Sequence, residues 1–131
     1  AVLVPEKIEV QRLTIPSEVV KEKLPKCEGD GDKILWLCHK PSTVPTHPTG
    51  PYLQNTLTLL LEAQEGLEPR TLLPCHRLDK VTSGLTLCTT DPAVAKLIQA
   101  QMDKKMVSKQ YIASVKVRID SQKYITNRLQ L

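Results

Sequence analysis

Residues 76–85 have the sequence His-Arg-Leu-Asp-Lys-Val-Thr-Ser-Gly-Leu, and this stretch is the most informative part of the 131-residue chain. A charged Asp79 stands beside a histidine and an arginine, and Ser83-Gly84 is a pair typical of turns. The residues that follow, 85–89, alternate between apolar and polar side chains as a strand does. The stretch therefore predicts a carboxylate on a turn just before an apolar strand. By itself, the spacing is explained equally well by a turn-forming Asp79 without chemistry.

Two further strands are predicted from local patterns. The apolar run over 33–38 predicts a strand that stops before Pro41, and repeated prolines exclude a helix over 41–51. Residues 109–117 alternate with period two, which puts Tyr111 on one face with three apolar residues. With 85–89 these runs give a sheet of three strands, which is small for a complete domain.

Two helices are predicted by their end signals. The run 55–64 has a plausible N-cap in Asn55 and a stop in Gly66. The second helix has Asp91 as its cap and Pro92 in its first position. Its apolar residues recur at helical spacing, and we interpret them as core residues: Val94, Leu97, Ile98 and Met102.

The N-terminal residues 1–26 are interpreted as an extension, because prolines divide them into short alternating pieces. Such an arm lies either on the domain or on a partner. Residues 27–131 then form one domain, since the chain is too short for two full domains. The order of strands and helices predicts an α+β fold, with a mixed or antiparallel sheet.

Composition restricts the classes of function. A formal charge of +4 and a pI of about 8.9 suit phosphate binding without requiring it. One Trp, three Tyr and no Phe exclude a broad aromatic platform for RNA. The four cysteines have no zinc-ligand spacing, and we expect Cys38 and Cys88 in the core. No apolar run reaches the roughly 20 residues of a membrane span, so a reducing intracellular compartment is expected.

Four short motifs in order give the chain a resemblance to a known family. The first three are similar to Asn-Lys-Pro, Val-His-Pro and His-Arg-Leu-Asp, and the last to Lys-x-Tyr. In this chain they are His39-Lys40-Pro41, Thr46-His47-Pro48, His76-Arg77-Leu78-Asp79 and Lys109-Gln110-Tyr111. Over residues 33–117 the chain therefore resembles the RluA-type RNA pseudouridine synthases, which isomerise uridine in place.

The resemblance implies a mainly antiparallel catalytic domain in which Asp79 is the catalytic carboxylate. It implies that Arg77 occupies the gap left by the flipped base, although a phosphate contact explains Arg77 as well. Tyr111 matches the tyrosine that packs on the target uracil and assists proton transfer at C5, so the resemblance implies a second catalytic residue there. Ordinary sheet packing is the alternative for Tyr111. Isomerisation imports no group and oxidises nothing, so neither a metal nor an organic cofactor is expected.

RNA is the expected partner, with ribosomal RNA preferred over transfer RNA. A structural or RNA-facing role is preferred for His76 over proton transfer, because neighbouring strand residues point to opposite sides. The remaining basic residues are expected to contact phosphate unless they are merely solvated. The RNA-binding set is Arg77, His76, Lys80, Lys40, His47 and Lys109.

One departure from the family pattern limits the prediction. Nothing in 121–131 matches the segment like Arg-x-His-Gln-Ile-Arg, whose basic residue pairs with the catalytic carboxylate in the family. The chain also begins at Ala1, and we expect it to be a fragment or a processed form. The alternatives are a non-catalytic RNA-binding or ribosome-assembly factor, with ribosomal or assembly proteins as partners, and a ligand-binding domain unrelated to RNA. The family suggests that a monomer suffices.

Overall fold

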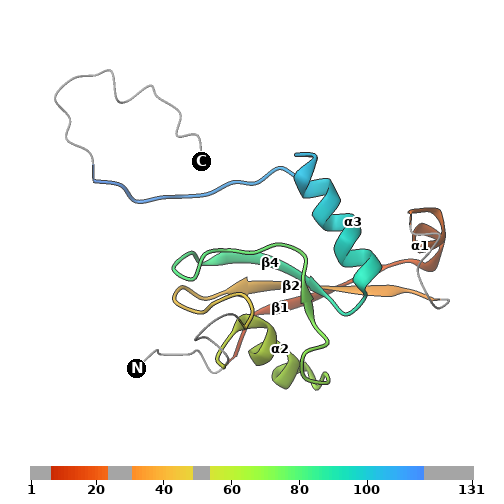
Figure 1. Ribbon diagram of the computed structural model, residues 1–131, viewed down its shortest axis with the longest axis horizontal. Helices are drawn as coiled ribbons and strands as arrows, with labels where there is room; N and C mark the ends of the chain where they lie inside the picture. The colour runs from red at the N-terminus through yellow and green to blue at the C-terminus, as the bar shows by residue number, and fades with distance from the viewer. Residues whose placement is uncertain (1–6, 24–30, 49–53, 117–131) are drawn as a thin grey trace.

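The computed structural model describes residues 7–23, 31–48 and 54–116 of the chain (Figure 1). Its strands form one sheet in the order β1-β2-β4-β3, and the three pairings are antiparallel. The strands are β1 (Val10–Ile15), β2 (Lys33–Lys40), β3 (Leu73–Pro74) and β4 (Gly84–Thr89). The helices are α1 (Ser17–Lys23), α2 (Leu57–Glu65) and α3 (Pro92–Asp103). The predicted α+β class with a mainly antiparallel sheet is confirmed.

The two central strands are those expected over 33–38 and 85–89. In β2 and β4, Trp36 lies opposite Cys88, and Cys38 lies opposite Thr86. Alternate residues of β2 are buried, and this alternation continues to its last residue, Lys40. The strand ends there because the next residue is a proline, which has no backbone N–H to donate to the sheet.

The described part of the N-terminal segment lies on the domain. β1 forms an edge of the sheet, with Val10 opposite Cys38 and Ile15 opposite Lys33. Ile8, just before β1, is buried in the core. The sequence analysis predicted neither this strand nor helix α1. The alternating runs in this segment are short and divided by prolines, so their pattern indicated only an extended arm.

Helix α2 begins one residue later than predicted. Asn55 is not its N-cap: it has a φ of 55°, and Thr56 is the capping residue, accepting a bond from the Leu59 amide at 3.4 Å. A capping residue needs an extended backbone, which Thr56 has and the left-handed Asn55 has not. The stop at Gly66 is confirmed, with φ 69° in the left-handed region.

Helix α3 begins as predicted. Asp91 caps it by accepting bonds from the amides of Ala93 at 2.9 Å and Val94 at 3.4 Å, and Pro92 occupies the first turn. Of the four predicted core residues, Val94 is buried and the other three are partly buried. None of the described helices is long and apolar enough to cross a membrane.

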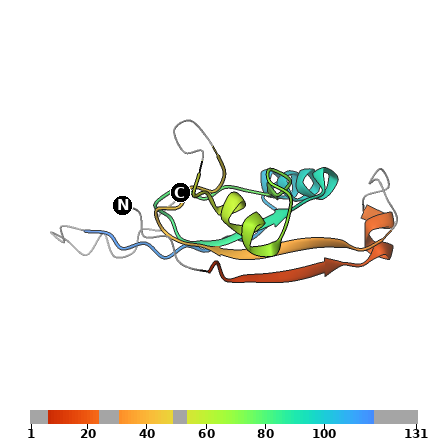
Figure 2. The same ribbon diagram turned by 90° about the horizontal axis from the view of Figure 1, so that it is seen from below.

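The core lies between the sheet and the helices. Figure 2 shows α2 and α3 on the same side of the sheet, and α3 contacts β3 and β4. The buried cluster consists of Ile8, Trp36, Cys38, Val44, Leu57, Leu61, Leu72 and Cys88. The core positions expected for Cys38 and Cys88 are confirmed, and their sulfur atoms lie 4.0 Å apart as free thiols. The strand that follows Asp79, β4, is thus part of the packed core through Cys88.

The strand predicted over 109–117 is wrong for the described residues. Residues 109–116 have no regular secondary structure, and residue 117 lies outside the described part. Figure 1 shows this stretch as an extended segment that runs away from the end of α3. A period-two pattern forms a strand only if a neighbour accepts its backbone hydrogen bonds, and neither described edge strand, β1 or β3, pairs with it.

Candidate active site

Asp79 lies on the loop of residues 75–83, the Asp79 loop, which connects β3 to β4. Its side chain is exposed, and its backbone carbonyl accepts a bond from the Thr82 amide at 3.0 Å, which closes a tight turn. Gly84 follows with φ 141°, a conformation that other residues rarely adopt. The predicted turn before the strand is confirmed. The glycine at this point allows the chain to enter β4 immediately after it.

The residue before Asp79 is held by a threonine from the segment between β2 and α2. The Thr46 hydroxyl donates to the Leu78 carbonyl at 2.9 Å and accepts from the Leu78 amide at 3.2 Å. One buried side chain therefore satisfies both backbone polar groups of Leu78. Sequence reasoning singled out position 46 only as part of a motif, because a bond across 32 residues has no local signal.

The residues after Asp79 are held by the same segment. The Thr43 amide donates to the Lys80 carbonyl at 2.8 Å, and the Ser42 hydroxyl donates to the Val81 carbonyl at 2.7 Å. These bonds fix the backbone on the C-terminal side of Asp79. The exposed carboxylate consequently stands on a loop whose backbone is anchored both before and after it.

Lys40 anchors this loop from inside the protein. Its side chain is 0% exposed, and its ammonium donates to the carbonyls of Pro41 at 3.0 Å, Val44 at 2.6 Å and Lys80 at 3.0 Å. Burial lowers the pKa of Lys40, and the nearby Asp79 carboxylate opposes that shift. The phosphate contact expected of Lys40 is wrong in this structure, because all three ammonium donors are used and none is exposed.

His76 continues the hydrogen bonding of the sheet where β3 ends. Its Nε2 accepts a bond from the Leu87 amide at 3.1 Å, while the Cys75 amide donates to the Leu87 carbonyl at 2.7 Å. A nitrogen that accepts a bond carries no proton, so the imidazole is neutral with its proton on Nδ1. Burial lowers the pKa of His76, and Lys109 lowers it further, in agreement with the neutral form.

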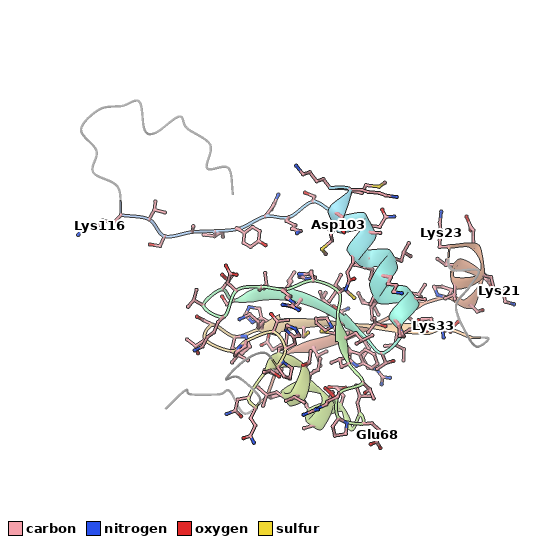
Figure 3. All side chains as sticks on the ribbon, in the orientation of Figure 1. Lys21, Lys23, Lys33, Glu68, Asp103 and Lys116 are labelled. Carbon is pink, nitrogen blue, oxygen red and sulfur yellow. The ribbon has the colours of Figure 1, made fainter. Side chains whose placement is uncertain are left out.

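A cavity of about 540 Å³, the basic pocket, lies between the start of the Asp79 loop and α3. It gathers four of the six residues predicted to bind RNA. Its polar lining is His47, His76, Arg77, Lys96, Gln99, Asp103 and Lys109. Lys96, Gln99 and Asp103 were not predicted, because their role depends on where α3 packs. Figure 3 shows Asp103 at the end of α3 from which the extended segment leaves.

The electrostatics of the basic pocket are dominated by cations. Burial lowers the pKa of His47, and the Arg77 guanidinium lowers it further. Burial first, and then a neighbouring positive charge, therefore shift the pKa of each of these two histidines toward the neutral form. Burial also raises the pKa of Cys75 to about 12, so this lining thiol stays protonated at neutral pH. The pocket is thus suited to an anion rather than to a cation.

Four predicted residues lie outside the lining of the basic pocket: Lys40, Asp79, Lys80 and Tyr111. Tyr111 is 52% exposed on the extended segment 106–116. Lys80 is half-buried, and its carbonyl is a bonding partner of Lys40. The structure therefore brings the histidines, Arg77 and Lys109 together but does not bring Tyr111 into the same group.

A larger cavity, of about 890 Å³, lies at the other end of α3 and includes none of the predicted residues. Its lining contains Lys33 and Asp91, whose charged groups are 3.0 Å apart. Within the described residues, no three His, Cys, Asp or Glu side chains are grouped to hold a metal ion. The carboxylates that line the larger cavity, Asp32 and Asp91, accept backbone hydrogen bonds at the starts of helices α1 and α3.

Taken together, these features define a class of domain that presents an exposed carboxylate on an anchored loop, with a cationic pocket at the start of that loop. Comparison with known proteins identifies the family. The family described as RNA pseudouridylate synthase matches residues 34–131, which is most of the chain. The chain belongs to this family, and the resemblance to its RluA-type members is confirmed.

Individual relatives agree with this assignment. The RNA pseudouridine synthase 7 of Arabidopsis thaliana is 43% identical over 82 residues, which are 63% of this chain and 20% of that protein. The tRNA pseudouridine(31) synthase of Saccharomyces cerevisiae is 41% identical over 87 residues, 66% of this chain and 20% of that protein. The chain thus spans about a fifth of the length of these curated relatives.

Among solved structures, the human RNA pseudouridylate synthase domain containing 4 is similar to this chain. The sequence identity is 26% and the TM-score is 0.45. The match covers 69% of this chain and 34% of the human one.

Proposed function

We propose that the protein containing this chain is an RNA pseudouridine synthase in which Asp79 is the catalytic carboxylate. The observation that supports this most directly is the exposed Asp79 on a loop anchored by Thr46, Thr43 and Lys40. A carboxylate that reacts must be accessible and held in one position, and this loop provides both. Family membership supports the type of reaction.

The reaction needs little more than a positioned carboxylate. The bond between N1 of uracil and C1′ of ribose breaks, the base rotates, and a bond forms between C5 and C1′. The proton on C5 is then removed and N1 gains one, so no atom is added or lost. Asp79 serves either as the nucleophile at C1′ or as the base at C2′, and both roles require the ionised form.

The basic pocket is proposed to bind the RNA backbone next to the target uridine. Arg77 is exposed and lines the pocket two residues from Asp79, so it can reach the space that a flipped base leaves. Lys109 adds a second permanent charge, and Lys80 follows Asp79 directly in the loop. Because the pocket is cationic, binding is expected to weaken steeply as salt increases.

The class of RNA remains a prediction. Ribosomal RNA was preferred from the sequence, whereas two yeast relatives are named for positions 31 and 32 of transfer RNA. We propose a uridine in structured RNA as the substrate. Mapping pseudouridine in both RNA classes, in cells with and without the protein, identifies which class loses a modification.

The test of the proposed function is Asp79→Asn in the whole protein, with Glu68→Gln as the control. Glu68 is exposed, and Figure 3 shows it just past the end of α2, at the bottom of the view. We expect Asp79→Asn to abolish pseudouridine formation while RNA binding persists, and Glu68→Gln to change neither. Pseudouridine formation that survives Asp79→Asn would refute the assignment.

A non-catalytic RNA-binding factor is the second candidate, and the position of Tyr111 favours it. A uracil-packing tyrosine should lie near the catalytic carboxylate, yet Tyr111 is on the exposed segment 106–116. This candidate predicts that the wild-type protein binds RNA in a salt-dependent manner but forms no pseudouridine. Cells carrying Asp79→Asn would then behave like the wild type.

A further inference from the structure

The Thr46 hydroxyl has a geometry that points to a role in the site itself. Thr46 is 4% exposed, and its Oγ1 lies 2.9 Å from the Leu78 carbonyl oxygen and 3.2 Å from the Leu78 amide nitrogen. The hydroxyl donates its single proton to the carbonyl and accepts from the amide with a lone pair. We propose that Thr46 is a positioning residue that fixes the backbone immediately before Asp79, an inference that rests on the proposed function.

The two bonds restrict the rotation that would move Asp79. A residue whose N–H and C=O are both bonded to one atom cannot turn about its backbone without losing at least one bond. Leu78 is in this state, the Asp79 carbonyl accepts from the Thr82 amide, and the Lys80 carbonyl accepts from Lys40 and Thr43. Asp79 therefore lies between two residues whose backbone is held by hydrogen bonds, Leu78 and Lys80. Its carboxylate can move only by rotation of the Asp79 side chain.

Thr46 itself is attached to the core. Its carbonyl accepts from the Thr58 amide at 3.2 Å, and the neighbouring Pro45 carbonyl accepts from the Leu57 amide at 2.8 Å. Leu57 and Thr58 open helix α2, and both are buried. A continuous path of bonds thus runs from the first turn of α2 through Thr46 to Leu78. The position of the carboxylate is set by a packed helix rather than by the loop alone.

The hydroxyl is not implied by the motif that Thr46-His47-Pro48 resembles, because Val-His-Pro has a valine at the position of Thr46. Valine has nearly the same shape but neither donates nor accepts a hydrogen bond. Substituting Thr46→Val therefore removes both bonds to Leu78 with little change in volume. Thr46→Ser restores the hydroxyl and removes only a methyl group, so this pair of variants separates hydrogen bonding from packing.

The first experiment measures single-turnover and steady-state kinetics on the RNA that the wild-type whole protein modifies. A small displacement of a reacting group can cost about 100-fold in rate. We expect Thr46→Val to lower kcat by about 10- to 100-fold with KM within twofold, and Thr46→Ser to recover kcat to within about threefold. A kcat for Thr46→Val within twofold of the wild type would overturn the proposal, and so would an equal loss in Thr46→Ser.

The second experiment does not depend on activity. Hydrogen exchange of the Leu78 amide in the wild-type protein should be as slow as that of amides inside β4, although Leu78 is in a loop. Exchange at the rate of an exposed loop amide would refute the Thr46 bond even if no variant folds. If the wild type forms no pseudouridine but Leu78 is protected, the proposed function fails while the positioning geometry stands.

Discussion

Replacing Lys40 by Met tests whether the buried ammonium holds the Asp79 loop in place. Lys40 donates to the carbonyls of Pro41, Val44 and Lys80, which come from two segments of the chain. Met has a similar length and no donor, so Lys40→Met removes the three bonds while it keeps most of the packing. We expect a less stable domain and a looser Asp79 loop.

The magnitude follows from the acceptors that remain. After the substitution, the Lys80 carbonyl keeps the Thr43 amide as a donor, whereas no other donor to Pro41 or Val44 is present among the described residues. A buried carbonyl without a partner costs about 1–3 kcal/mol; Val44 is buried and Pro41 is half-buried, which gives about 1–6 kcal/mol for the two. The substitution also removes the cost of desolvating the buried ammonium, and this gain offsets part of the loss. We therefore expect a loss of about 2–3 kcal/mol in the free energy of unfolding.

Urea unfolding of the whole protein measures this loss, and Lys21→Met is the matched control. Lys21 is exposed on α1, so its substitution removes the same charge and should change stability by less than about 0.5 kcal/mol. If Lys40→Met is as stable as Lys21→Met, the three bonds do not hold the loop and our reasoning about Lys40 is refuted.

Three further predictions concern the loop and the pocket. The folded-state pKa of His76 is lowered from 6.5, so the neutral imidazole stabilises the fold above that pH, and this stability is lost as the pH falls through the folded pKa. In urea unfolding at several pH values, the free energy of unfolding should therefore fall more steeply toward acid for the wild type than for His76→Gln. Equal slopes for the two proteins would contradict this. Arg77→Ala should reduce the slope of log affinity for RNA against log salt by about 1, measured by titration at several salt concentrations, and an unchanged slope would mean that Arg77 contacts no phosphate. Gly84→Ala should destabilise the fold by about 1–3 kcal/mol in urea, because alanine is strained at φ 141°, and a neutral effect would exclude that strain.

Signals that lie within a few residues predicted the structure well. Asp91 and Pro92 start α3 and Gly66 ends α2, because capping depends on bonds inside one turn. The turn before β4 is also local, because the Thr82 amide closes it on the Asp79 carbonyl and Gly84 follows at φ 141°. The strand expected over 109–117 failed for the opposite reason, since a strand depends on a partner elsewhere in the chain.

The residues that hold the Asp79 loop could not be found from local patterns. A lysine in a motif is ordinarily exposed, and only the alternation of buried residues along β2, ending at Lys40, indicates that its side chain points inward. Thr46 meets Leu78 across 32 residues, and His76 bonds to the next strand rather than to its neighbours in sequence. The motif proposes Asp79 as the reacting residue, whereas the contacts that hold its loop depend on the tertiary packing. Substitutions that disturb Thr46 or Lys40 should therefore lower the rate without touching the carboxylate, and this separates a supporting residue from a reacting one.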